Sequence, residues 1–278
     1  MSDFVKQVGC CNSFEGDVAW VILSPIEQSI KQKIEAVGTP LKDWDIQINY
    51  GIKTGCNEAF IVSTEKRDEI LANCQTEDER KRTEELIRPI LRGRDIKRYG
   101  YNWANLWLIN THNGIRGKLE RIHIENYPAV KEHLDQYWDK ISKRADKGDT
   151  PYNLRNCAYL DLFFQPHICW KAVGRKLAFA LVEGGTFLTA PASFISGDNY
   201  NDTILAFLCS PIGTYFIYKN SDTTGAGDIM LNIQSLIKFP IPQRRLDLNG
   251  KTEDEIATEI YSIYGFTNNE IKYINNQI

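Results

Sequence analysis

Residues 44–62, WDIQINYGIKTGCNEAFIV, contain the pattern on which the predicted fold depends. The first seven residues alternate apolar and polar side chains, as in a β-strand with one buried face. A Gly-x-x-x-Gly turn follows, and we expect a second strand at Ile61–Val62. The stretch therefore predicts a hairpin-like loop that presents three polar side chains to a binding partner: Lys53, Thr54 and Asn57.

A phosphate-binding P-loop is the alternative for this glycine-containing turn. The Walker pattern requires Gly-Lys-Ser/Thr at the start of a helix. In this chain Lys53 does not follow a glycine, and a strand is expected after the turn. The sequence therefore disfavours nucleotide binding. For Lys53, contact with a DNA phosphate and contact with a base stay open. For Asn57, a side chain bonded to its own turn is the alternative to adenine recognition.

A second stretch, residues 88–99, RPILRGRDIKRY, is strongly basic although the chain has a formal net charge of −3. Clustered cations favour a polyanionic partner, because each cation near a phosphate releases condensed counter-ions. The alternative is a solvated turn between a helix, which Pro89 is expected to end, and the strand that follows. We expect DNA contacts from four residues of this stretch: Arg92, Arg94, Lys97 and Arg98.

Further candidate DNA contacts lie on expected loops and at a helix end. Arg175 is the favoured base contact, because guanine recognition by arginine is the commonest direct contact to a base. For the cations at the end of the helix that begins at Tyr127-Pro128, the alternative is simple complementation of the helix dipole. The remaining candidates are Arg144 and Lys147 at that helix end, Lys171 beside Arg175, and Lys219 with Asn220 before a glycine-rich loop.

The composition is that of an ordinary globular protein, with 278 residues, 42% hydrophobic and 25% charged. No apolar run approaches the roughly 18 residues of a membrane span. The N-terminus lacks the features of a secretory signal. The seven cysteines form no Cys-x-x-Cys pair, so we expect neither a zinc site nor a disulfide framework. Reduced thiols in a cytoplasmic protein are the simplest interpretation.

No motif supports catalysis. The four histidines form no metal-binding pattern, and neither Gly-x-Ser-x-Gly nor Gly-x-Gly-x-x-Gly occurs. Asp95-Ile96-Lys97 matches half of a metal-dependent nuclease site, but two-metal chemistry needs several converging carboxylates. The chain is therefore predicted to be a binder. A nuclease that uses Asp95 and Lys97 is one alternative, and a protein-interaction module with cations around a hydrophobic patch is another.

Local patterns predict helices and strands in alternation along the chain. Ser24-Pro25 is typical of a helix start, and Thr252 and Thr267 begin capping boxes in an acidic tail. One helix is expected to end at Pro89, with Ile87, Ile90 and Leu91 on its buried side. Another is expected over residues 128–141, with Trp138 buried. Residues 159–194 are predicted to be β-structure, beginning with a strand at Leu160–Phe164.

Several blocks in order resemble the TaqI-like specificity domains, which are the C-terminal target-recognition domains of type IIG restriction–modification enzymes and related adenine methyltransferases. The resemblance spans roughly residues 18–278. His167 stands where the family pattern usually has lysine. The matching blocks are residues 44–61, 91–99, Tyr127-Pro128 with its helix, 143–148, 166–170, 237–242 and 264–271.

The resemblance implies a mixed α/β (α+β) fold with a twisted, largely antiparallel sheet, flanking helices and a helical C-terminal tail. It implies a DNA target-recognition domain at 18–242 and the tail at 243–278, with 1–17 as a leader or expression remnant. The implied partner is double-stranded DNA, without catalysis or cofactors in this chain. We expect the chain to be cut from a longer enzyme that carries methyltransferase and possibly nuclease domains upstream and uses S-adenosylmethionine and Mg²⁺.

Overall fold

The structure, a computed structural model, describes residues 23–197 and 201–278, so the predicted leader at 1–17 lies outside it. Chain contacts divide the protein into two compact units. The larger unit comprises Asp45–Leu205 and Ser221–Ile233. The smaller unit comprises the residues up to Trp44, Ala206–Asn220 and Gln234–Ile278. The expected functional boundary between residues 242 and 243 stays a prediction.

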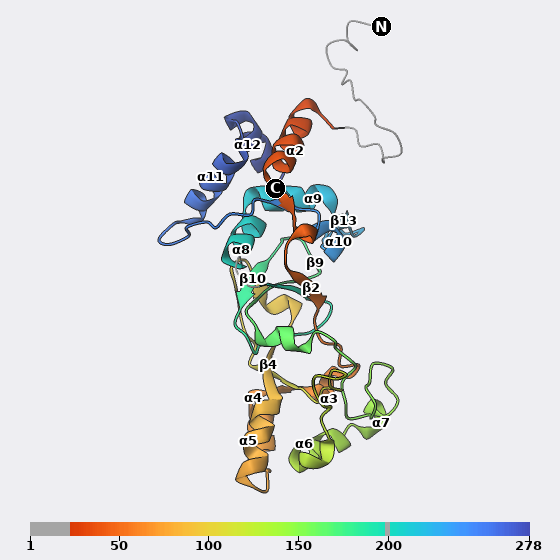
Figure 1. Cartoon of the computed structure of the whole chain (residues 1–278). Coiled ribbons are helices and arrows are strands. Elements are labelled where there is room, and N and C mark those ends of the chain that lie inside the picture. Colours follow the sequence, from red (N-terminus) through yellow and green to blue (C-terminus); the bar gives the residue numbers. More distant parts are fainter. Residues whose placement is uncertain (1–22, 198–200) are drawn as a thin grey trace, which may run out of the picture. The chain divides into compact units, whose positions relative to one another are not determined.

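Two four-stranded sheets form the centre of the larger unit (Figure 1). The first has the order β10-β8-β12-β2 and is antiparallel throughout: β2 (Gln47–Tyr50), β8 (His167–Trp170), β10 (Phe179–Val182) and β12 (Ser193–Ser196). The second has the order β11-β4-β7-β3, in which only the β11–β4 pair is parallel: β3 (Ile61–Ser63), β4 (Ile87–Leu91), β7 (Leu106–Ile109) and β11 (Phe187–Leu188).

Smaller strands and helices surround these sheets. The minor strands are β5 (Ile96–Lys97), β6 (Gly100–Tyr101), β9 (Val173–Gly174), β13 (Asp222–Thr223) and β14 (Ile229–Met230). The helices are α3 (Asn57–Phe60), α4 (Thr64–Ala72), α5 (Glu77–Leu86), α6 (Pro128–Asp135) and α7 (Trp138–Ile141), with 3-10 turns η2 (Gly93–Asp95), η3 (Ile124–Asn126) and η4 (Leu160–Phe164). Aromatic side chains pack together in the core, where Phe163 stacks on Phe187 with 4.6 Å between the ring centroids. The predicted mixed α/β class with largely antiparallel sheets is confirmed.

The smaller unit is mostly helical, and its helices begin where the capping patterns predict. Ser24 accepts a hydrogen bond from the backbone of Glu27 and completes a capping box at α2 (Pro25–Val37). Thr252 and Thr267 do the same at α11 (Glu253–Tyr264) and α12 (Asn268–Asn275), which form the predicted helical tail. The other elements are β1 (Thr39–Pro40), η1 (Leu41–Asp43), α9 (Pro211–Asn220) and β15 (Pro240–Ile241), and α8 (Asn201–Cys209) and α10 (Ile233–Leu236) include residues of both units.

The helix predicted to end at Pro89 is wrong over its last turn. α5 ends at Leu86, and Ile87–Leu91 is strand β4. Proline is tolerated in a strand where no ladder hydrogen bond is required of its nitrogen. Pro89 lies opposite Trp107 of β7, but β11 pairs only with Ile90 and Leu91, so Pro89 has no strand partner on the β11 side.

Three other predictions of local structure are also wrong. Leu160–Phe164 is a 3-10 turn rather than a strand, because a short apolar run does not specify its own period. The strand expected at Ile61–Val62 is present as β3, but the predicted hairpin is not formed, because helix α3 follows the glycine-containing turn and β2 and β3 belong to different sheets. The helix predicted over residues 128–141 is interrupted at Tyr137, whose φ of −108° and ψ of 13° are not helical. The interruption turns the Trp138 side chain outward, with 44% of its surface exposed. Among the described residues, no helix has the length and apolar character to cross a membrane.

Candidate nucleic-acid interface

Three parallel segments of the larger unit end side by side, at Ile52, Leu91 and Thr189, and two of them are followed by a basic residue. Leu188 of β11 pairs with Leu91 of β4, and the amide of Thr189 donates to the carbonyl of Leu91 at 2.9 Å. Thr189 also forms a parallel bridge with Ile52. Because parallel segments leave a sheet at the same end, Lys53 and Arg92 emerge on either side of the Thr189 segment. Two strand spacings, about 10 Å, separate their backbones.

The basic stretch then runs against the end of the β8–β10 hairpin. A Cβ atom built at Gly93 would lie 3.3 Å from the Cβ of Lys171, so the two backbones are in close approach. The amide of Tyr99 donates to the carbonyl of Phe179 at 2.8 Å. These contacts join segments from three parts of the sequence into one surface, which we call the basic edge. It consists of Lys53, Arg92, Arg94, Lys97, Arg98, Lys171 and Arg175.

Arg92 and Asp95 form the rigid part of the basic edge. The guanidinium donates from Nε and Nη2 to the two carboxylate oxygens of Asp95, at 2.9 and 2.8 Å. The backbone amide of Arg92 donates to the same carboxylate at 2.8 Å. Burial opposes the charge of Asp95, but the bonds from Arg92 outweigh it and the pKa of Asp95 is lowered. Asp95 therefore holds the turn η2 as a carboxylate.

The nuclease alternative requires Asp95 and Lys97 to act together, and their contacts give this no support. Asp95 is 5% exposed, and both of its oxygens are occupied by Arg92. The Lys97 amine donates to the carbonyl of Arg94 at 3.0 Å. Within the described ranges, no group of three His, Cys, Asp or Glu side chains is placed to hold a metal ion.

Four further cations of the basic edge are exposed at the surface. Arg94, Lys97 and Arg98 are exposed, and the guanidinium of Arg98 lies 4.8 Å from the ring centre of Tyr99. Arg175 follows β9 with 82% of its side chain exposed, and its Nε lies 3.7 Å from a carboxylate oxygen of Asp228. At such exposure an ion pair of this length contributes little, so Arg175 can exchange Asp228 for another acceptor.

Arg144 supports the loop that carries Lys53. Its side chain is inside the protein, at 7% exposure, and its guanidinium donates to four backbone carbonyls. These belong to Thr54, to Asp146 at 2.6 Å, to Pro151 at 3.0 Å and to Asn153 at 2.6 Å. Burial lowers the pKa of Arg144 to about 10. The sequence predicts a DNA contact for Arg144, whereas in the structure its guanidinium is bonded to backbone carbonyls of the protein's own loops.

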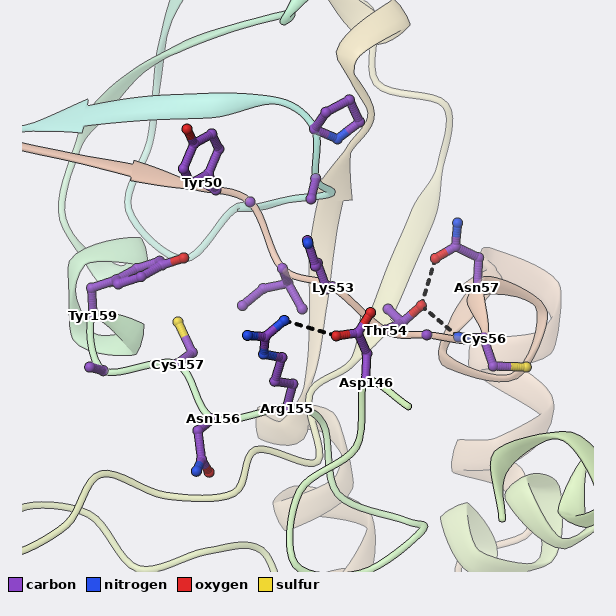
Figure 2. A pocket seen from close by; sticks show the side chains of 16 residues that line it. Tyr50, Lys53, Thr54, Cys56, Asn57, Asp146, Arg155, Asn156, Cys157 and Tyr159 are labelled. Atoms are coloured by element: carbon purple, nitrogen blue, oxygen red, sulfur yellow. Dashed lines mark hydrogen bonds and ion pairs between the residues drawn. The ribbon is translucent and has the colours of Figure 1, made fainter. Parts of the chain in front are cut away.

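A pocket of about 920 Å³ opens beside the Lys53 loop (Figure 2). Arg155 and Asp146 form an ion pair of 2.9 Å across its lower wall, and Tyr50 and Tyr159 line the opposite part. Lys53 points into the space between these walls. Its amine has no acidic partner within 4 Å among the residues that the structure describes. The pocket is therefore open, and Lys53 is the cation of its lining that lacks an acidic partner among the described residues.

Of the other predicted residues near the Lys53 loop, Thr54 is buried, and Asn57 and Lys147 are exposed. Thr54 is 1% exposed, and its hydroxyl donates to the amide oxygen of Asn57 at 2.6 Å. Asn57 is exposed and bonds this neighbouring side chain rather than its own backbone. Lys147 is also exposed, although its amine donates to the carbonyl of Ser142 at 2.8 Å. Asn57 and Lys147 keep surface with which to contact a ligand, whereas Thr54 does not.

Lys219 and Asn220 belong to the smaller unit, whereas the residues of the basic edge belong to the larger unit. They form the last turn of helix α9 and not a loop, which corrects the predicted setting. The Lys219 amine donates to the carboxylate of Glu27 at 2.8 Å, and the resulting bond lowers the pKa of Glu27 to about 2. The side-chain amide of Asn220 donates to the carbonyl of Phe216 at 2.8 Å.

Sequence analysis misses Arg155, Asn156 and Tyr50 as residues of the pocket. Arg155 and Asn156 stand in an irregular segment without a motif, and only the fold brings them to the Lys53 loop. Tyr50 ends strand β2 with its ring half exposed, and the alternating pattern that locates the strand does not distinguish it from any other surface aromatic. No local pattern predicts these three residues.

No protein-family model and no curated protein sequence matches this chain. Solved structures do share its fold. The type IIL restriction–modification enzyme MmeI, in complex with DNA, superimposes with a TM-score of 0.58 at 13% identity, over 86% of this chain and 35% of that one. The type IIG restriction endonuclease BpuSI superimposes with a TM-score of 0.51 at 15% identity, over 91% and 31%.

The fold is one found in restriction–modification enzymes. The expectation drawn from the ordered sequence blocks is confirmed at the level of the fold, for a type IIG and a type IIL enzyme. This restriction–modification fold spans about a third of the length of each of the two enzymes.

Proposed function

We propose that this chain recognises a target sequence in double-stranded DNA on behalf of a type IIG-like restriction–modification enzyme. The observation that carries the proposal is the basic edge, where cations from three separate parts of the sequence meet on one surface of a protein with a net negative charge. Such a local excess of positive charge is suited to the phosphates of a duplex. The shared fold with an enzyme seen in complex with DNA supports the same partner.

The geometry suggests different tasks for different members of the basic edge. Arg94 is exposed on turn η2, and Lys97 and Arg98 are exposed on the β5–β6 hairpin that follows. These three side chains suit phosphate contacts, which position a protein on DNA. Arg175 suits a base contact, because its long side chain is almost fully exposed and its fork matches guanine. Lys53 and Asn57 at the pocket extend the surface. Recognition by residues 18–242 is part of this proposal.

In this proposal the chain itself is not catalytic. Methyltransferase and nuclease domains, with S-adenosylmethionine and Mg²⁺, would belong to other parts of a longer adenine-N6 methyltransferase or endonuclease that acts in the cytoplasm. Cleavage of DNA by the purified chain in the presence of Mg²⁺, abolished by Asp95→Ala, would overturn this part of the proposal.

Duplex binding by Arg94→Ala/Arg98→Ala tests the basic edge. The matched control is Arg80→Ala/Lys81→Ala, which also removes two exposed cations but from helix α5, where Glu77, Asp78 and Glu79 precede them. We expect the edge variant to bind every duplex more weakly, with a salt slope reduced by about one unit per lost phosphate contact. The control should bind like the wild type. Equal binding by all three proteins at low salt would refute the proposal.

A further inference from the structure

Residues 115–119 form a tight turn whose tip is basic. Ile115 and Leu119 exchange two backbone hydrogen bonds, at 2.8 and 2.9 Å, and the tip between them is Arg116-Gly117-Lys118. Both cations are exposed. Neither has an ion pair or hydrogen bond from its side chain to another described residue. The turn thus presents two positive charges that the protein itself does not use.

The base of this turn is held firmly. Gly114 has a φ of +75°, and a Cβ atom there would lie 2.5 Å from the carbonyl oxygen of Leu119, so the chain can close only at glycine. Asn113 donates from its amide to Asp149 at 3.0 Å and accepts from the backbone of Asp149 at 2.9 Å. Arg121 pairs with the same carboxylate at 3.2 Å. A fixed base lowers the entropic cost of binding through the tip.

A second hollow of about 640 Å³ lies beside the turn and shares the wall Asn156–Ala158 with the pocket of Figure 2. The two hollows therefore lie next to each other, one at the Lys53 loop and the other at the 115–119 turn. Each contains one acid, and each acid is paired with an arginine: Asp146 with Arg155 at 2.9 Å, and Asp149 with Arg121 at 3.2 Å.

This pairing leaves one cation in each hollow without an acidic partner among the described residues. In the first hollow it is Lys53, and in the second it is Arg116. Lys118 adds a third charge at the tip of the turn. A concave surface whose uncompensated charges are all positive attracts anions, and the two hollows are adjacent, so an extended anion could contact the cations of both.

We propose that the 115–119 turn is a second DNA-contacting element, in which Arg116 and Lys118 bind backbone phosphates of the duplex that lies on the basic edge. The inference rests on the proposed function and extends the contact surface along the wall Asn156–Ala158. Phosphate contacts of this kind position the duplex and do not depend on its sequence.

The test is a salt titration of duplex binding by Arg116→Ala/Lys118→Ala, with Arg80→Ala/Lys81→Ala as the control of equal charge. Loss of two phosphate contacts should reduce the salt slope by about two units, so that the fall in affinity between about 50 and 200 mM salt becomes about tenfold smaller. The decrease in affinity should be the same on cognate and scrambled duplexes. Thermal melting should be unchanged, because the two side chains support no other described residue.

The charge-preserving variant Arg116→Lys/Lys118→Arg should keep the wild-type slope, which separates charge from shape. If the wild type binds DNA and Arg116→Ala/Lys118→Ala binds with the same slope, the turn contacts no phosphate and the inference is overturned while the proposed function stands. If the wild type itself fails to bind duplex at low salt, the proposed function fails and this inference fails with it.

Discussion

Replacing Arg144 by methionine should destabilise the protein strongly, although Arg144 makes none of the proposed DNA contacts itself. Methionine fills much of the same space but donates no hydrogen bond. Among the four carbonyls that lose a donor, those of Thr54 and Asn153 take part in fully buried bonds. An unsatisfied buried acceptor costs about 1–3 kcal/mol, so the two together predict a loss of about 2–6 kcal/mol. The carbonyls of Asp146 and Pro151 are partly exposed and can bond water instead.

Urea unfolding followed by tryptophan fluorescence measures this loss. Lys143→Met is the matched control, because Lys143 is the exposed neighbour of Arg144 and its side chain contacts no acid among the described residues. We expect the control to stay within about 0.5 kcal/mol of the wild type, as surface substitutions do. Arg144→Lys should fall between, because a lysine amine has three donors and cannot span four carbonyls. A free energy of unfolding for Arg144→Met that equals that of Lys143→Met would refute the argument.

Three further outcomes are expected. Asp95→Asn should lower the free energy of unfolding by about 1–3 kcal/mol in urea titrations, because the charged bonds to Arg92 are lost, and no change would argue against a structural role for Asp95. Burial lowers the pKa of His133 below its ordinary 6.5, so unfolded chains bind more protons and stability should fall as the pH drops below about 6.5. His133→Gln should remove up to about 1.4 kcal/mol per pH unit from that slope, and an unaltered slope would contradict it. Arg175→Ala should cost about 1–3 kcal/mol on the cognate duplex of the longer enzyme and little on a scrambled one, whereas equal losses on both would make Arg175 a phosphate contact.

Local chemistry explains most of what could be predicted from the sequence. Ser24, Thr252 and Thr267 begin helices because their hydroxyls satisfy backbone amides three residues later, and this requires nothing from the rest of the chain. The alternation at residues 44–50 likewise predicts a strand, and β2 occupies the second half of that stretch, Gln47–Tyr50. Where the neighbours along the chain decide the conformation, the sequence is sufficient.

The wrong predictions are those that depend on partners distant in sequence. Ile87–Leu91 is a strand because β7 and β11 pair with it, although the apolar spacing also fits a helix. In the sequence Arg144 cannot be distinguished from other cations at a helix end, because the four carbonyls around it are brought together only by the fold. The basic edge could be predicted only in part. Its cations were predicted one stretch at a time, but their meeting depends on the parallel register of Thr189 with Ile52, which no local pattern shows.

The way in which Arg144 holds the Lys53 loop has a consequence for how such a protein can evolve. Its guanidinium bonds backbone carbonyls, which every amino acid possesses, so the support does not depend on the side chains at the positions it holds. Lys53 and Asn57 are exposed and take no part in those bonds. A mutation of Lys53 can therefore change what the loop contacts while its path stays the same, whereas a mutation of Asn57 also removes the acceptor of the buried Thr54 hydroxyl. If the chain recognises DNA as proposed, such a loop can acquire a new contact through a single substitution at Lys53 without loss of its backbone support.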